Sequence, residues 1–222
     1  MIRMGVGLDH PEVSRRAAVI VAHPDDEVLW AGGTILARPM WIWRIVSLCR
    51  GADPDRAPRF QRVLAELGAT GRIGDLDDGP EQRPLPEHEV AEAAASLLDE
   101  HSFDVVLTHG PRGEYTRHRR HEEVCRAVVR LWADGRIETR TLWMFAFEDG
   151  GRSHLPRAMA DAPLRERLTE EVWLEKRRLM TALYGFAAES WEARATPREE
   201  AYWSFDDPAA ASAWVAAQGV ES

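Results

Sequence analysis

The stretch AAVIVAHPDDE at residues 17–27 decides the fold that we predict for this chain. Residues 17–22 form a continuous apolar run without polar alternation, which is typical of a parallel strand covered on both faces. A turn with His23 and Pro24 follows, and residues 27–37 then have helical character. A buried strand that leads through a tight turn into a helix indicates the first unit of an α/β fold.

The same alternation continues along the chain. We predict further strands at residues 41–49, 103–108, 141–147 and 200–205, and helices ending near residue 67 and at 86–100, 119–133, 168–184 and from 207 onward. These elements indicate a Rossmann-like α/β fold with a largely parallel sheet flanked by helices. We expect a single domain over residues 1–222, with a core at about 17–185 and a C-terminal extension at about 186–222.

Composition excludes several classes of protein. The chain has 222 residues with 37 acidic and 28 basic side chains, a net charge of −9 that argues against nucleic-acid binding. No apolar run approaches the roughly 20 residues that span a bilayer, so we expect no membrane span. Cys49 and Cys125 are too few for a disulfide framework, and we expect a cytoplasmic protein. The oligomeric state is not indicated.

Several charged side chains follow the first strand within one turn. Carboxylates as close as Asp25, Asp26 and Glu27 repel each other unless a cation or a shared proton compensates. Pro24 stiffens the turn and fixes the direction of its neighbours. The alternative is an ordinary helix N-terminus capped by one aspartate, which explains neither His23 nor the second aspartate.

A second polar cluster follows the strand at residues 103–108. That strand ends at His109 and leads to His118 and His121, which share one helix face because they are three residues apart. His121 also continues the apolar stripe that includes Val124, so it should point inward. An inward histidine is often only a core residue. Two imidazoles and a carboxylate with an open fourth position, however, make a catalytic zinc site, and Fe²⁺ or Co²⁺ would also fit.

These motifs carry a resemblance to a known family. The hexapeptide AHPDDE at residues 22–27, followed by His-x-x-His at 118–121, resembles the PIG-L/LmbE-like family of zinc-dependent N-acetylglucosaminyl deacetylases. The resemblance covers roughly residues 17–185, and its further matching segments are Gly32-Gly33-Thr34, Leu67-Gly68, Thr108-His109 and Gly113-Glu114-Tyr115. It implies the same α/β fold and a hydrolase that removes an N-acetyl group from an N-acetylglucosamine-type sugar or conjugate.

The resemblance also implies a role for individual residues. His23, Asp26 and His121 would be the metal ligands. Asp25 would be the general base that acts on a zinc-activated water, and His118 would stabilise the oxyanion or protonate the leaving amine. The products would be acetate and a free sugar amine.

We expect arginines to contact the part of the substrate that is attached to the amino sugar. The family usually has Pro-Asp between the two histidines, whereas this chain has Arg119-Arg120, so the usual aspartate support of the histidines is missing. We expect His109, Arg56 and Arg120 to contact the small-molecule substrate. A basic rim that includes Arg112, Arg117, Arg119 and Arg120 would suit an anionic conjugate. The alternatives are hydrolysis of another small amide or N-acyl substrate at the same metal site, or a non-catalytic sugar-binding module.

Two further acidic segments have ordinary interpretations. Asp75, Asp77 and Asp78 favour a solvated turn, with contacts to substrate hydroxyls as the alternative. Glu148 and Asp149 follow a strand and favour a turn, although they could reach the site.

Overall fold

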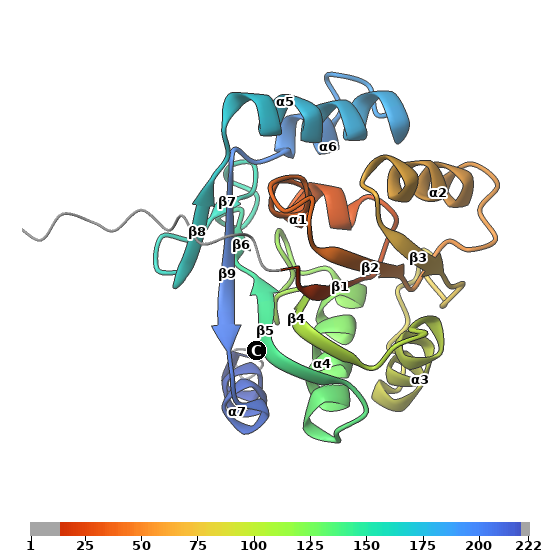
Figure 1. The fold of residues 1–222 in the computed structure, drawn as a ribbon, viewed down its shortest axis with the longest axis vertical. Coiled ribbons are helices and arrows are strands. Elements are labelled where there is room, and N and C mark those ends of the chain that lie inside the picture. Colours follow the sequence, from red (N-terminus) through yellow and green to blue (C-terminus); the bar gives the residue numbers. More distant parts are fainter. Residues whose placement is uncertain (1–13, 219–222) are drawn as a thin grey trace, which may run out of the picture.

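The central sheet of the protein has seven strands in the order β3-β2-β1-β4-β5-β9-β8 (Figure 1). The computed structural model describes residues 14–218. The strands are β1 (Arg16–Val21), β2 (Ile42–Ser47), β3 (Thr70–Ile73), β4 (Ser102–Thr108), β5 (Glu138–Phe145), β8 (Leu164–Arg167) and β9 (Glu199–Phe205). The first five strands of the sheet are parallel, which confirms the predicted Rossmann-like α/β class.

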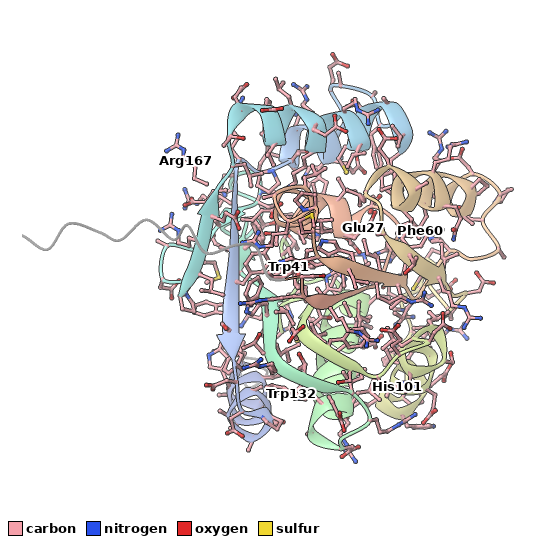
Figure 2. All side chains as sticks on the ribbon, viewed as in Figure 1. Glu27, Trp41, Phe60, His101, Trp132 and Arg167 are labelled. Carbon is pink, nitrogen blue, oxygen red and sulfur yellow. The ribbon has the colours of Figure 1, made fainter. Side chains whose placement is uncertain are left out.

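Helices cover both faces of the sheet (Figure 1). One face carries α1 (Asp26–Leu36), α2 (Arg56–Glu66), α5 (Glu170–Arg178), the π-helix η1 (Leu179–Leu183) and α6 (Trp191–Ala195). The other face carries α3 (Glu87–Leu97), α4 (Arg119–Ala133) and α7 (Pro208–Gln218). Figure 2 shows side chains filling the layer between the helices and the sheet, among them Phe60 of α2.

Burial on both faces explains the apolar run of β1. Ala18 and Ile20 pack in the core under α3 and α4, whereas Val19 and Val21 pack in the core under α1 and α2. All four side chains are inaccessible to solvent. A strand covered in this way has no position for a polar side chain until it emerges at its carboxyl end, where His23 stands.

The far edge of the sheet is antiparallel. Strand β9 runs antiparallel to β5, and β8 runs antiparallel to β9. A separate two-stranded ribbon joins β6 (Phe147–Glu148) and β7 (Arg157–Ala158). The segment after residue 186 therefore supplies β9 to the main sheet as well as α7, which packs on α4.

A buried ion pair joins this edge to α1. Glu200 of β9 accepts hydrogen bonds from the backbone N–H groups of Gly33 and Thr34, both at 2.7 Å. The ammonium of Lys176 also lies 2.7 Å from Glu200, and neither side chain is exposed. Because α1 carries Asp26, this network fixes one wall of the site described below.

Neither a membrane-spanning helix nor a disulfide is present within residues 14–218. None of the helices within residues 14–218 has the length and apolar character that crossing a bilayer requires. Cys49 and Cys125 are both buried, and neither forms a disulfide.

Candidate active site

The turn after β1 has a strained backbone. Asp25 has φ 119°, in the left-handed region that non-glycine residues rarely adopt. Its N–H donates to Glu27 Oε2 at 3.0 Å, and its carbonyl accepts from Leu29 N–H at 2.8 Å. Such strain persists only where the surroundings over-determine it, and it is concentrated at functional sites.

Glu27 supports this turn from below. Its carboxylate is fully buried and also accepts a hydrogen bond from the hydroxyl of Tyr184. Burial raises the pKa of Glu27 to about 7. Glu27 therefore acts as a structural brace for the backbone of Asp25 and does not line the cavity.

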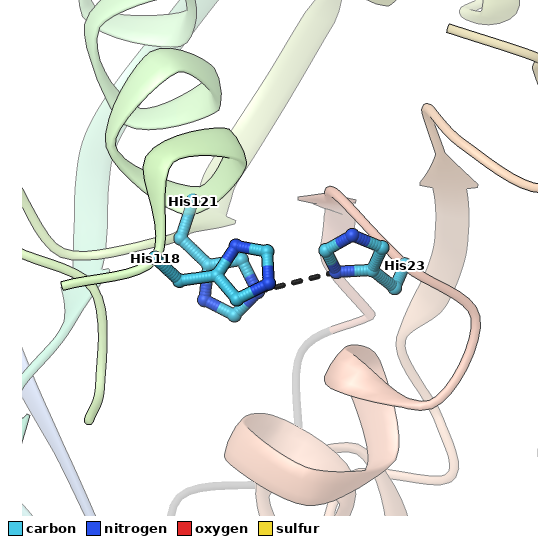
Figure 3. A group of neighbouring side chains, drawn as sticks. All are labelled: His23, His118 and His121. Atoms are coloured by element: carbon cyan, nitrogen blue, oxygen red, sulfur yellow. Dashed lines mark hydrogen bonds between the residues drawn. The ribbon is translucent and has the colours of Figure 1, made fainter. Parts of the chain in front are cut away.

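The second polar segment joins β4 to α4. His109 directly follows β4, the loop at 110–118 crosses the carboxyl end of the sheet, and His121 lies in the first turn of α4. Strands β1 and β4 are neighbours in the sheet, so the two polar segments meet at one edge. Figure 3 shows the rings of His118 and His121 on the α4 side facing His23 on the β1 side.

Three donor atoms converge at this edge. Nδ1 of His23 lies 3.2 Å from Asp26 Oδ2 and 3.2 Å from Nε2 of His121. Nε2 of His121 lies 3.3 Å from the same Asp26 oxygen. Ligands bound at about 2.1 Å to a tetrahedral zinc ion are about 3.4 Å apart. This donor set, two imidazoles and one carboxylate, therefore fits a metal ion with an open position.

Other donor sets overlap this one. His109 stacks on His121 with ring centroids 3.9 Å apart, but its Nε2 accepts a hydrogen bond from Ala22 N–H at 2.9 Å and has no free lone pair. Cys49 lies near His23, but burial raises the pKa of its thiol. His23, His118 and His121 form a further overlapping set, so the ligand role of His23, Asp26 and His121 is a proposal that rests on the triangle of donor atoms.

A buried carboxylate orients the histidines from behind. Glu114 is inaccessible to solvent and accepts hydrogen bonds from Nδ1 of His121 at 2.6 Å and Nδ1 of His109 at 3.0 Å. Its other oxygen accepts from Gly110 N–H at 2.8 Å. A carboxylate on Nδ1 fixes the tautomer that leaves Nε2 of His121 free for a metal. Because Arg119 and Arg120 stand between His118 and His121, no aspartate there can orient the histidines, and Glu114 orients His121 and His109 instead.

His118 lies over the ligand set on the cavity side. Its ring stacks on that of His121 with centroids 4.3 Å apart. Burial, together with the neighbouring His121 and His23, lowers the pKa of His118 to about 3, so its imidazole is neutral. Nδ1 of His118 is buried without a hydrogen-bond partner among the described residues.

Asp25 points into the cavity beside the ligands. Arg56 Nη1 donates to Asp25 Oδ2 at 3.0 Å, and the Arg56 guanidinium also lies 4.5 Å from the centre of the Phe186 ring. Burial and the neighbouring Asp26 raise the pKa of Asp25, while Arg56 opposes the rise. A cation at the ligand set would favour the ionised form further.

His23, Asp25, Asp26 and His118 line the base of a cavity of about 770 Å³. Arg50, Asp53, Arg56, Asp78, Pro80, Gln82, Tyr115, Trp191 and Glu192 form its outer wall. Trp191 packs on Tyr115 with ring centroids 4.6 Å apart and is 37% exposed. The cavity is thus polar at its base and aromatic on one side, as small-molecule sites commonly are.

Asp78 lines the cavity, although the sequence favoured a solvated turn at this position. Its carboxylate Oδ1 lies 3.3 Å from Nε2 of His23, and Oδ2 lies 2.6 Å from Arg50. Its side chain is only 7% exposed. The acidic segment in the sequence was the available signal, but the partner of Asp78 lies in a different βα unit.

The arginines expected at the rim are placed differently. Arg56 lines the cavity, whereas Arg112, Arg117, Arg119 and Arg120 do not. Arg117 pairs with Glu122, and Arg120 is fully buried. His109 is also buried beneath the ligands. The placement of Arg120 and His109 therefore gives no support to direct contact with a substrate, and the basic side chains on the cavity wall are Arg50 and Arg56.

The sequence around this site matches a known protein family. The family model described as GlcNAc-PI de-N-acetylase (PIG-L) matches residues 18–132, a range that includes His23 and His121. No curated protein matches the sequence significantly.

Several solved structures share the fold. One is the N,N'-diacetylchitobiose deacetylase of Pyrococcus horikoshii, with TM-score 0.63 and 15% identity over 90% of this chain and 87% of that one. A deacetylase of the teicoplanin biosynthetic pathway has TM-score 0.61 and 14% identity over 86% and 98% of the two chains. GalB, the 4-carboxy-2-hydroxymuconate hydratase of Pseudomonas putida, has TM-score 0.54 and 17% identity over 81% and 82%. At these identities the likeness is one of fold.

Proposed function

Because this chain belongs to the PIG-L family of GlcNAc-PI de-N-acetylases, we propose that it removes the N-acetyl group from an N-acetylglucosamine-type sugar or conjugate. The observation that carries the proposal is the triangle of donor atoms from His23, Asp26 and His121, with the carboxylate of Asp25 beside it on the cavity wall. Zinc is the metal we propose, and Fe²⁺ or Co²⁺ would suit the same ligands.

Asp25 is the proposed general base. Zinc, when bound, polarises the acetamide carbonyl and lowers the pKa of the attacking water. Asp25 accepts the proton of that water, and its raised pKa makes it a stronger base than an exposed aspartate. Arg56 holds the carboxylate in place through the hydrogen bond to Oδ2. The same carboxyl group then returns the proton to the nitrogen of the departing amine.

His118 is the proposed donor to the oxyanion. Its ring lines the cavity next to the ligand set, and its Nδ1 has no partner among the described residues. A neutral imidazole can donate one hydrogen bond to the developing charge. Burial lowers the pKa of His118 and favours its neutral form, so we assign proton transfer to the amine to Asp25.

The outer wall suits a polar sugar. A cavity of about 770 Å³ accommodates an amino sugar with part of an attached group. Asp78 and Gln82 supply hydrogen-bonding groups for hydroxyls, and Arg50 and Arg56 supply positive charge for an anionic substituent. Trp191 presents a partly exposed aromatic surface.

A second candidate keeps the metal and changes the bond. Hydrolysis of another small amide would use the same residues, since nothing in the ligand set selects a sugar. The GalB hydratase shares the fold at TM-score 0.54, so the fold alone does not choose the substrate. A non-catalytic sugar-binding module is the least favoured alternative, because donor atoms of His23, Asp26 and His121 lie 3.2–3.3 Å apart, as a metal site requires.

Substrate choice can be tested directly. The zinc-loaded protein is assayed for acetate and free amine with N-acetylglucosamine, N,N'-diacetylchitobiose, phosphate-linked N-acetylglucosamine and several N-acetyl amino acids. We expect the wild type to release acetate from the amino sugars, and Asp25→Asn to do so at least about a hundredfold more slowly. Turnover of the N-acetyl amino acids alone would favour the second candidate, and no turnover of any amide would overturn the enzymatic proposal.

A further inference from the structure

Arg120 is the least expected buried side chain of the molecule. It lies in the first turn of α4, directly before His121, and has no solvent exposure. Burial of a guanidinium is costly unless its charge is paired and its N–H groups have hydrogen-bond acceptors. Its neighbour Arg119 is exposed, as a helix N-terminus at the surface would allow. The burial of Arg120 therefore requires an explanation from its contacts.

Those contacts join α4 to both ends of the segment at residues 77–83. Nε donates to the carbonyl of Asp77 at 2.6 Å, and Nη2 donates to the carbonyl of Arg83 at 2.9 Å. Nη1 pairs with the carboxylate of Glu123, the next acid on the same helix face. Glu123 in turn accepts from Leu85 N–H at 3.1 Å. One planar side chain thus closes the segment into a loop against α4, a geometry that suits a guanidinium and not an ammonium.

The segment held in this way carries part of the cavity wall. Asp78, Pro80 and Gln82 line the cavity, and Gln82 Nε2 donates to Asp78 Oδ1 at 2.8 Å. That same oxygen lies 3.3 Å from Nε2 of His23. A carboxylate at Nε2 fixes the tautomer of His23 that leaves Nδ1 free to face the other metal ligands.

We propose that Arg120 is a positioning residue, which clamps residues 77–83 against α4 and thereby holds Asp78 on the His23 ring. The inference rests on the proposed function for its catalytic consequence, but the clamp itself does not depend on it. In this chain Glu114 supports His121 directly, and Arg120 supports His23 from a distance through Asp78.

The test compares Arg120→Lys with the matched control Arg119→Lys. A lysine can still pair with Glu123 but cannot reach both carbonyls of the segment at once. We expect at least about tenfold faster amide hydrogen exchange in the peptide that covers residues 77–83, and zinc affinity reduced by about 10- to 100-fold in a chelator competition. Arg119→Lys should match the wild type in both measurements.

The coupling to Asp78 is tested by a double-mutant cycle. If Arg120 acts through Asp78, zinc affinity in Arg120→Lys/Asp78→Asn equals that in Asp78→Asn alone. Additive losses would overturn the proposed route. The variant Arg120→Met/Glu123→Met removes the clamp without leaving a buried charge unpaired. Wild-type exchange and zinc affinity in both Arg120 variants would overturn the clamp, and these readouts stand even if no amide substrate is hydrolysed.

Discussion

The carboxylate of Glu114 accepts a hydrogen bond from Nδ1 of His121 at 2.6 Å, and both side chains are inaccessible to solvent. This relationship decides the tautomer of the histidine. With the proton held on Nδ1, Nε2 carries the lone pair that faces Asp26 and His23. Glu114 therefore orients the imidazole of His121, which we propose as a metal ligand.

Glu114→Gln should weaken metal binding. Both imidazoles donate to Oε2 of Glu114 while Oε1 accepts from Gly110 N–H, so an amide must place its NH2 group, which cannot accept, against one of these donors, and the hydrogen bonding that orients His121 is disrupted. We expect zinc affinity to fall by about 10- to 100-fold in a chelator competition. Glu122→Gln, on the same helix but paired with Arg117, is the control and should keep wild-type affinity. Unchanged affinity in Glu114→Gln would contradict the role.

The two histidines of the His-x-x-His segment should separate in their effects. His121→Ala should lose stoichiometric zinc, because one of the three proposed protein ligands is removed. Under the proposed roles, His118→Ala should keep zinc and lose rate, because His118 would donate a hydrogen bond to the oxyanion and would not bind the metal. Elemental analysis of the purified variants gives the metal content directly. One zinc ion per chain in purified His121→Ala would contradict the assignment of His121 as a ligand.

Asp25→Asn should keep the metal and lose activity. Asparagine preserves the shape of the side chain but cannot accept a proton, so the rate should fall by at least about a hundredfold. Asp134→Asn is a suitable control, since Asp134 is exposed at the C-terminal end of α4 and does not line the cavity. The measurement is acetate release at saturating substrate with zinc content determined in parallel. Near-normal turnover would show that Asp25 is not the base.

Local patterns were enough to predict how the strand before His23 and the imidazole of His121 are placed. The apolar run before His23 predicted a doubly covered strand, and the helical spacing of His121 and Val124 predicted an inward imidazole. Both inferences use side-chain periodicity, which depends only on neighbours in the chain. The parallel order of β1 and β4 then brings the two segments together.

Long-range partners were outside the reach of such patterns. Asp78 looks like part of a solvated acidic turn until His23 of another βα unit is placed beside it. Arg120 has the sequence context of a surface arginine, and only the position of residues 77–83 shows why it is buried. Strand β8 and helix α6 were missed because each is short and has no complete apolar period of its own.

Asp149 supports the loop that carries Tyr115 and His118. Its Oδ2 accepts from the backbone N–H of Thr116 at 2.8 Å and from the Thr116 hydroxyl at 2.7 Å. Its Oδ1 accepts from Gly151 N–H at 3.0 Å. Burial opposes ionisation, but these hydrogen bonds outweigh it and lower the pKa of Asp149 below its usual 3.8.

Asp149→Asn should therefore destabilise the protein in a pH-dependent way. A carboxyl group whose pKa is lower in the folded state stabilises that state above the unfolded value of 3.8, and the contribution is lost as the pH falls through the folded value. At pH 7 we expect a loss of about 1–2 kcal/mol in the free energy of unfolding, from weaker hydrogen bonds to Thr116 and Gly151. The difference from the wild type should shrink as the pH is lowered from 5 to 3. Urea unfolding across this range measures it, with the exposed Asp206→Asn as control, and a difference that stays constant with pH would contradict the assignment.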